Sequence, residues 1–230
     1  MTAAASLLRP QMVLCDLDGT LVDSVPDLAY CVDTMLARLG RAPCGEAAVR
    51  NWVGNGLERL VRRALVGALD GEPDASEFDR AYPIFLELYA EYTFERAALY
   101  PGVREGLDFL KAAGYPLGLV TNKAARFTGP LLRHLGLYED FGIIISGDTL
   151  PACKPDPLPL QHAARHFGAD PAASLMVGDS VSDVRAARAA KFGIICTSYG
   201  YNHGQDIRDS GPDAVIDSLT ELTGILAPSR

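Results

Sequence analysis

Short runs of apolar residues, rich in valine, isoleucine and leucine, recur along the chain. They lie at residues 12–15, 116–120, 142–145, 174–177 and 193–196. Such runs are typical of β-strands that are buried on both faces of a sheet. Segments with helical apolar spacing lie between the later runs, at residues 103–113, 125–135 and 183–191. Because strand and helix alternate, the pattern predicts an α/β fold with a doubly wound parallel sheet.

Residues 24–99 break this alternation. Their apolar side chains follow a helical period, as in Leu28 and Val32, and they contain no run that predicts a strand. We therefore expect an all-helical domain at 24–99, inserted into a sheet domain made of residues 1–23 and 100–230. Two adjacent crossings of the chain would connect the two domains, and such a pair can act as a hinge.

The composition narrows the classes of partner. The chain has 230 residues, 48% of them hydrophobic, and a net charge of -8 without a basic stripe, which argues against nucleic acid and anionic membranes as partners. An enzyme of small metabolites fits better, although an anionic substrate would need a local positive charge or a metal ion. The chain has no apolar run long enough for a membrane span and no signal-peptide pattern, so we expect a cytoplasmic protein.

Cysteine and histidine give little chemical signal. The five cysteines are scattered and lack the C-x-x-C spacing, which predicts free, buried structural thiols rather than disulfides or a zinc site. Cys15 should point away from its neighbour Asp16 by strand alternation. His134, His162 and His166 fall on expected helices without ligand spacing, and we interpret them as surface or packing residues.

The strongest chemical signal is the sequence Asp16-Leu17-Asp18-Gly19-Thr20, directly after the first apolar run. Asp16 and Asp18 are two positions apart, so both side chains point to the same side while the chain stays extended. Taken alone, the motif is also compatible with an ordinary turn. A calcium loop is a weaker alternative, because the further acidic positions of that pattern are missing.

Polar residues also follow other expected strands, and this strengthens the signal. These groups are Thr121-Asn122, Lys154-Pro155 and Gly178-Asp179-Ser180-x-x-Asp183. Taken singly, each group also has a purely structural interpretation: Thr121 as a helix cap, Lys154 as a solvated cation and Gly178-Asp179-Ser180 as a turn. In open parallel sheets, however, ligands bind at the carboxyl ends of the strands. Together the groups supply two carboxylates, a magnesium site, a cation and a hydroxyl, which is the set that phosphoryl transfer needs.

Electrostatics explains why a cation and a metal belong in such a site. A carboxylate that approaches a phosphate dianion meets a repulsion of about 4 kcal/mol per charge at 4 Å and intermediate dielectric. Mg²⁺ held by Asp16 and Asp179 offsets part of this repulsion, and Lys154 can cover another face of the phosphoryl group.

In order and spacing, these motifs resemble those of the haloacid dehalogenase (HAD) superfamily of phosphatases, over nearly the whole chain. The resemblance implies a Rossmann-like core with a helical cap, Asp16 as the nucleophile, and Asp18 as the general acid and base. It implies that Mg²⁺ is bound by Asp16, the main-chain carbonyl of Asp18 and Asp179, with Asp183 in the outer shell of the metal. Thr121 and the amide of Asn122 would bind phosphoryl oxygens beside Lys154.

Within the superfamily, residues 51–56 and 199–204 look most like bacterial phosphoglycolate phosphatases. This likeness implies hydrolysis of 2-phosphoglycolate to glycolate and phosphate through an aspartyl-phosphate. Asn55 and Gly56 would face the substrate from the cap, and Arg59, with Arg62 or Arg63 as alternatives, would contact its carboxylate. The other interpretation is that the glycines start a helix whose arginines face solvent.

Other functions stay open. A phosphosugar phosphatase or a β-phosphoglucomutase-like mutase would share the nucleophile and the cap. A phospho-accepting regulatory protein would not need Asp18 to activate water, and a dehalogenase would lack this second carboxylate. We expect a small phosphorylated metabolite as the partner and a monomer or homodimer as the assembly.

Overall fold

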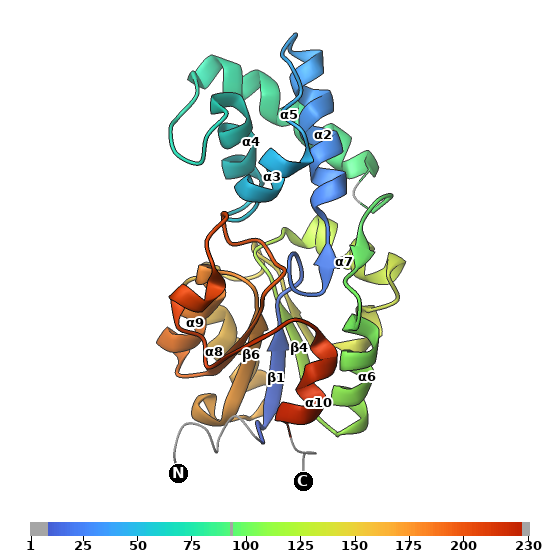
Figure 1. Cartoon of the computed structure of the whole chain (residues 1–230), viewed down its shortest axis with the longest axis vertical. Helices are drawn as coiled ribbons and strands as arrows, with labels where there is room; N and C mark the ends of the chain where they lie inside the picture. Colours follow the sequence, from blue (N-terminus) through green and yellow to red (C-terminus); the bar gives the residue numbers. More distant parts are fainter. Residues whose placement is uncertain (1–8, 93, 227–230) are drawn as a thin grey trace. The chain divides into compact units, whose positions relative to one another are not determined.

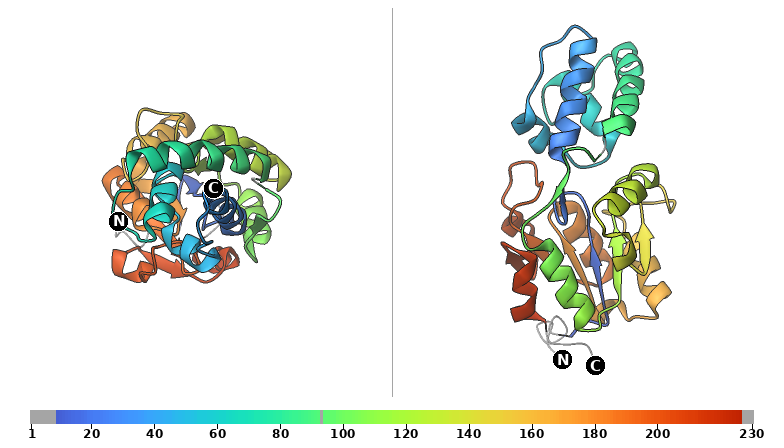
Figure 2. Two further views of the ribbon diagram at one scale, coloured as in Figure 1. Left: turned by 90° about the horizontal axis from the view of Figure 1, so that it is seen from above. Right: turned by 90° about the vertical axis from the view of Figure 1, so that its right-hand side faces the viewer.

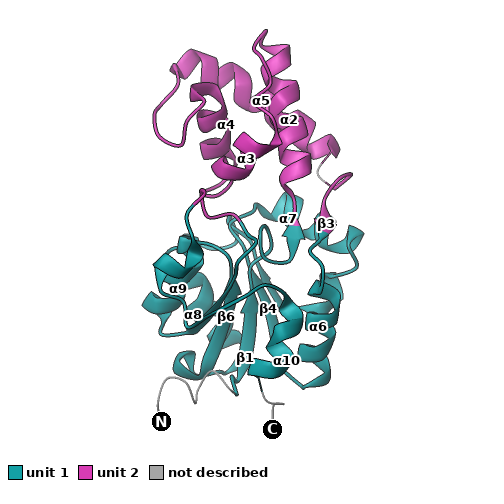
Figure 3. Cartoon of the chain, in the orientation of Figure 1, with its two compact units in different colours: residues 1–22, 99–200, 205–230 teal, residues 23–98, 201–204 magenta. Residues whose placement is uncertain are grey.

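The computed structural model of the chain describes residues 9–92 and 94–226, which divide into two compact units (Figure 3). One unit contains the described residues up to 22, residues 99–200 and those from 205 onward. The other contains residues 23–98 and 201–204. The segment 201–204 thus groups with the helical unit, whereas the sequence pattern assigned it to the sheet domain. The functional division into core and cap stays a prediction.

The larger unit is built on a six-stranded parallel sheet in the order β5-β4-β1-β6-β7-β8 (Figure 1). Its strands are β1 (Met12–Cys15), β4 (Leu117–Val120), β5 (Ile143–Ile145), β6 (Ser174–Gly178), β7 (Gly193–Thr197) and β8 (Ala214–Ile216). The predicted parallel α/β fold is confirmed, and each predicted strand is present. The sequence pattern missed the edge strand β8, because its apolar run is only three residues long and lies between two aspartates.

The strand order reverses at β1, which lies at the centre of the sheet. After β1 the sheet is extended by β4 and β5 on one side, and the chain then crosses to build β6, β7 and β8 on the other side. Cys15 is in register with Leu119 of β4 and Val177 of β6. The carboxyl ends of these strands are therefore neighbours at the point where ligands bind in such sheets.

Helices cover both faces of this sheet (Figure 2). Met12 and Leu14 of β1 pack in one apolar cluster with α8 (Leu158–Phe167) and α9 (Val181–Ala190), and Figures 1 and 2 show α6 (Val103–Ala112) on the opposite face. Alternate side chains of each strand thus reach two different cores, as expected for doubly buried strands. The remaining elements of the unit are α7 (Ala125–His134), α10 (Leu222–Ile225) and the 3₁₀ turns Tyr138–Asp140, Pro171–Ala173, Ile207–Ser210 and Leu219–Glu221.

The smaller unit is helical, as its apolar spacing predicts. It comprises α2 (Val25–Arg38), α3 (Glu46–Trp52), α4 (Leu57–Val66) and α5 (Ala75–Tyr92). Its core includes the fully buried Met35, Phe85 and Tyr89. The short strands β2 (Val22–Asp23) and β3 (Ala98–Leu99) pair where the chain passes between the units. The sequence pattern missed both, because two residues are too few to form an apolar run. Among residues 9–92 and 94–226, no helix is both long enough and apolar enough to cross a membrane.

The segment 201–204 is tied to the start of α2. The hydroxyl of Tyr201 donates to Asp23 Oδ1 at 2.5 Å and accepts from the backbone N–H groups of Ser24 and Val25 at 3.1 and 3.4 Å. Arg50 completes this group through an ion pair of 2.9 Å with Asp23. Besides the two expected crossings, the chain therefore also enters and leaves the helical unit at 200–201 and 204–205.

Candidate active site

Asp16 lies at the carboxyl end of the central strand. Its backbone N–H continues the ladder by donating to the carbonyl of Val177 in β6 at 2.9 Å. Its carboxylate is nearly buried and accepts from the N–H of Leu17 at 2.7 Å. The strand pairing thus fixes the backbone, and the next peptide fixes the carboxylate, at the edge where a ligand would bind.

Lys154 joins two carboxylates. Its Nζ lies 2.8 Å from Asp16 Oδ1 and 2.7 Å from Asp183 Oδ1, and its side chain is 2% exposed. Asn122 supports this arrangement, because its Nδ2 donates to the Lys154 carbonyl at 2.8 Å. Burial alone lowers the pKa of a lysine, but attraction to Asp16 and Asp183 outweighs burial here and raises the pKa of Lys154. Lys154 is therefore a permanent cation of the site.

Asp179 and Asp183 are held at the junction of β6 and α9. Asp179 Oδ1 accepts from the hydroxyl of Thr20 at 2.7 Å. Asp183 Oδ2 accepts from the N–H and the hydroxyl of Ser180 at 3.0 and 2.7 Å, which forms a capping box at the start of α9. A Cβ at Gly200 would overlap the side chain of Asp179, so this position requires glycine. Both carboxylates are thereby fixed by local structure.

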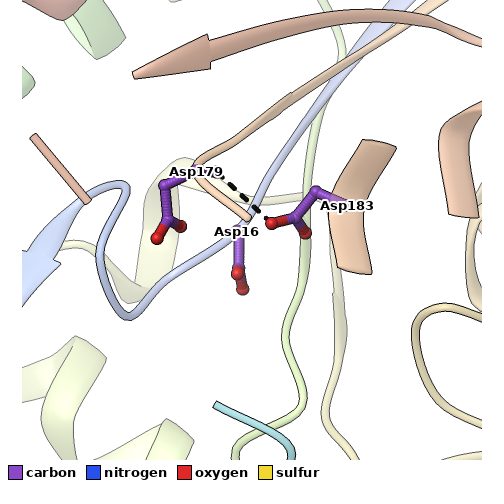
Figure 4. A group of neighbouring side chains, drawn as sticks. All are labelled: Asp16, Asp179 and Asp183. Atoms are coloured by element: carbon purple, nitrogen blue, oxygen red, sulfur yellow. Dashed lines mark hydrogen bonds between the residues drawn. The ribbon is translucent and has the colours of Figure 1, made fainter. Parts of the chain in front are cut away.

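Asp16, Asp179 and Asp183 converge on one region (Figure 4). One carboxylate oxygen of each lies within 4.8 Å of the others. When ionised, the three carboxylates carry three negative charges and Lys154 balances one, so a divalent cation would neutralise the group. Hard carboxylate oxygens are also the donors that Mg²⁺ prefers. Because both Asp183 oxygens already accept hydrogen bonds, Asp16 and Asp179 are better placed to bind an ion directly.

The charge balance around Asp16 has a measurable consequence. Burial is the main cause that raises its pKa from 3.8 to about 7, attraction to Lys154 opposes this, and repulsion by Asp183 adds to it. Lys154 contacts two carboxylates and can neutralise only one of them. Without a metal ion, the raised pKa of Asp16 favours a proton on this carboxylate below about pH 7, and this proton supplies the missing positive charge.

We expect the metal-free chain to lose stability as the pH rises from about 4 to about 7. In this window Asp16 is ionised in the unfolded state but keeps its proton when folded. The native state then binds more protons, and the free energy of unfolding falls as the pH increases. Urea unfolding in a chelator, compared between wild type and Asp16→Asn, measures this effect. Parallel curves for the two proteins would contradict it.

Asp18 carries a different partner. Its two carboxylate oxygens lie 3.1 and 3.2 Å from Nζ of Lys123, and the side chain of Lys123 is 2% exposed. Sequence reasoning missed Lys123, although it directly follows Thr121-Asn122 and is a cation at the end of the same strand. The site therefore contains two buried ammonium groups, each paired with a different carboxylate of the first motif.

Thr121 and Asn122 occupy the loop after β4. Thr121 is 3% exposed and its Oγ1 accepts from the N–H of Lys123 at 3.2 Å, so its own O–H remains available to donate. The structure thus brings the predicted core residues to the carboxyl ends of adjacent strands. Their catalytic roles stay predictions.

Cysteine contributes no reactive group beside Asp16. All five cysteines are free thiols, as the sequence predicts, although Cys153 is exposed and Cys44 is half-buried rather than buried. Cys15, next to Asp16, is fully buried, and burial raises the pKa of its thiol to about 12. A thiolate is therefore not available there at neutral pH.

The predicted substrate loop in the helical unit is shaped by backbone geometry. Gly54, Asn55 and Gly56 have φ values of 118°, 64° and 88°, in the region that favours glycine. Arg63 holds this loop, because it donates to the Trp52 carbonyl at 2.6 Å and to Asn55 Oδ1 at 3.1 Å. Arg63 is thus a structural residue of the helical unit.

Arg59 and Arg62 lie on the same helix as Arg63, but they pair with an exposed carboxylate rather than with the predicted substrate loop. Arg59 pairs with Glu72 at 2.7 Å, and Arg62 pairs with the same carboxylate at 2.9 Å while its guanidinium stacks on Phe78. Neither arginine is as deeply buried as Arg63. Contact of Asn55, Gly56 or Arg59 with a substrate stays a prediction.

We expect Arg63→Met to destabilise the chain by about 2 kcal/mol, because buried carbonyl groups lose their donor. Arg62→Met is the matched control on the same helix and removes an ion pair to the exposed Glu72, a change expected to cost less than about 1 kcal/mol. Chemical denaturation of both variants measures the difference. An equal effect of the two substitutions would contradict a structural role of Arg63.

Known proteins resemble this chain over almost its full length. Residues 10–191 match the family of haloacid dehalogenase-like hydrolases. A phosphoglycolate phosphatase of Nitrosococcus oceani is 61% identical over 221 residues, which cover 96% of this chain and 98% of that protein. The phosphoglycolate phosphatase of Nitrosospira multiformis is 46% identical over 217 residues, which cover 94% of this chain and 96% of the relative. A crystal structure of a predicted phosphoglycolate phosphatase from Haemophilus somnus superposes with a TM-score of 0.88 at 35% identity, covering 98% of this chain and 99% of that one.

Proposed function

Because the chain belongs to the haloacid dehalogenase-like hydrolase family, we propose that it is a magnesium-dependent phosphatase that hydrolyses 2-phosphoglycolate to glycolate and phosphate. The observation that carries this proposal is the pairing of the buried Asp16 with Lys154 beside Asp179. This arrangement offers a carboxylate nucleophile, a fixed cation for the phosphoryl oxygens and oxygen ligands for a divalent ion. We infer the substrate from the relatives, which are named phosphoglycolate phosphatases.

In the first step, a carboxylate oxygen of Asp16 attacks phosphorus and the bond to the leaving oxygen breaks. The carboxyl proton of Asp18 goes to that leaving oxygen, which departs as the hydroxyl of glycolate. The hydroxyl of Thr121 donates to a phosphoryl oxygen, and the ammonium of Lys154 balances charge on the same group. The product of this step is an aspartyl-phosphate on Asp16.

In the second step, Asp18 accepts a proton from water, and the resulting oxygen attacks phosphorus. The bond between phosphorus and Asp16 breaks, which releases phosphate and restores both carboxyl groups to their starting states. Asp16, the Asp18 carbonyl and Asp179 would hold Mg²⁺, and the ion would supply charge neutralisation at the phosphoryl oxygens when bound. Asp183 acts from outside this ligand set by holding Lys154 at 2.7 Å.

The test is phosphate release from a panel of phosphorylated two- to six-carbon metabolites and nucleotides. We expect 2-phosphoglycolate to show the highest kcat/KM, and we expect a chelator to abolish turnover until Mg²⁺ is added back. Calcium should restore little activity, because its larger and looser coordination shell misplaces the attacking oxygen. Activity that persists in the chelator would contradict the metal requirement.

The panel also separates the alternatives. Preference for a sugar phosphate with phosphate release would indicate a phosphosugar phosphatase, and an isomerised sugar phosphate without net release would indicate a mutase. A single burst that leaves a lasting phosphoprotein would indicate a regulatory phospho-acceptor. The proposal includes a cytoplasmic location and a monomeric or homodimeric state.

A further inference from the structure

Lys123 is a second buried cation of the site and has no role in the mechanism above. Its side chain is 2% exposed, and Nζ contacts both oxygens of Asp18 at nearly equal distances, 3.1 and 3.2 Å. The two residues are 105 positions apart in sequence. A buried ammonium is costly unless it is paired, so this contact must compensate the desolvation of Lys123.

The backbone of Lys123 is held from several directions. Its carbonyl accepts from the N–H of Gly147 at 2.9 Å and from the hydroxyl of Thr128 at 3.2 Å, while its own N–H donates to Thr121 Oγ1. A Cβ at Gly147 would overlap the carbonyl oxygen of Asn122, so this close approach requires glycine. The backbone of Lys123 is therefore fixed against helix α7 and the loop that follows β5.

We propose that Lys123 is a positioning residue that orients the carboxylate of Asp18 for proton transfer. An ammonium that contacts both oxygens of one carboxylate restricts rotation about the bond that carries it. When Asp18 takes up a proton on one oxygen, the ammonium can still donate to the other, so the direction of the carboxyl group is kept. Lys154 contacts Asp16 and Asp183 instead, so the two lysines serve different carboxylates. This inference rests on the proposed phosphatase function and assigns Lys123 to the steps that use Asp18.

The test separates proton transfer from phosphorus attack by the choice of leaving group. An alkyl phosphate such as 2-phosphoglycolate needs a proton on its leaving oxygen, whereas para-nitrophenyl phosphate loses a stable anion. In single-turnover experiments with Lys123→Met, we expect leaving-group release from the alkyl ester to slow by about 10²-fold, the cost of a misplaced catalytic group. Release from the aryl ester should slow by less than about 3-fold, since general-acid catalysis contributes little there.

Two further variants test whether the effect depends on the charge at position 123. Lys123→Arg keeps the charge and should recover part of the lost rate on the alkyl ester. Lys111→Met removes an ammonium that pairs with Asp140 and is 46% exposed, and it should leave both rates unchanged. Equal slowing of both esters by Lys123→Met would overturn the proposal, because a general structural defect acts on every substrate.

A double-mutant cycle gives an independent result. In the Asp18→Asn background, Lys123→Met should slow leaving-group release from the alkyl ester by less than a further factor of about 2, because the effects of residues that act as a unit are not additive. If the rate loss of the double variant equals the product of the two single rate losses, Lys123 acts independently of Asp18, and the proposal is overturned. Wild-type hydrolysis of both esters reports separately on the phosphatase function. Crystal structures of wild type and Lys123→Met test the orientation itself: an unchanged Asp18 carboxylate in the variant refutes the inference even if neither ester is hydrolysed.

Discussion

Replacing Asp16 with asparagine is expected to lower kcat by about 10⁴-fold or more, the scale seen when a nucleophile is removed. The side-chain amide of asparagine is a poor nucleophile and cannot form the aspartyl-phosphate. Asparagine has nearly the shape of aspartate, so the packing around β1 should be retained. Steady-state phosphate release and a test for acid-stable phosphoprotein measure the loss.

Asp16→Asn should lower activity without lowering the stability of the fold. Above about pH 7 in a chelator, wild type carries an ionised Asp16 that burial disfavours, and the neutral asparagine removes this charge. Asp16→Asn should therefore be at least as stable as wild type under these conditions, which rules out unfolding as the cause of lost activity. Asp16→Ala controls for deamidation of the asparagine. Turnover near the wild-type rate in both variants would contradict the nucleophile assignment.

Replacing Lys154 with methionine is expected to damage both activity and stability. The variant keeps the length of the side chain but removes the ammonium that lies between Asp16 and Asp183. In a chelator at pH 8, we expect the free energy of unfolding to fall by about 3 kcal/mol, because a buried charge loses its partner. Turnover should fall by about 10²-fold or more, since one fixed electrostatic contact to the phosphoryl group is lost.

The stability loss of Lys154→Met should shrink at pH 5, because Asp16 is then protonated in both proteins and only Asp183 loses a charged partner. Lys111→Met is the control: its side chain is 46% exposed and Asp140 keeps its ion pair with Arg104, so its removal should change stability by less than about 1 kcal/mol. Urea unfolding at pH 5 and pH 8 gives the free energy of unfolding of wild type, Lys154→Met and Lys111→Met. A loss that is independent of pH would show that Lys154 acts mainly by packing.

Much of the sheet could be predicted because doubly buried strands carry their signal locally. The run at β1, for example, is fully apolar and fully buried, so its pattern alone identifies it. The edge strand β8 gives a weaker signal, because its apolar run is only three residues long and stands between Asp213 and Asp217. The attachment of residues 201–204 to the helical unit was also missed. It depends on the hydroxyl of Tyr201 meeting Asp23, and no local pattern encodes a contact between positions 178 residues apart.

The sequence by itself determined the α/β fold, the candidate residues of the site except Lys123, and the order of its motifs. These follow from apolar periodicity and from the rule that parallel strands present their carboxyl ends at one edge. The tertiary structure alone decided the pairing: Lys154 with Asp16 and Asp183, and Lys123 with Asp18. Pairing depends on strand order and side-chain direction across long sequence separations, and in a buried site it determines which charges are neutralised and which still require a proton or a metal ion.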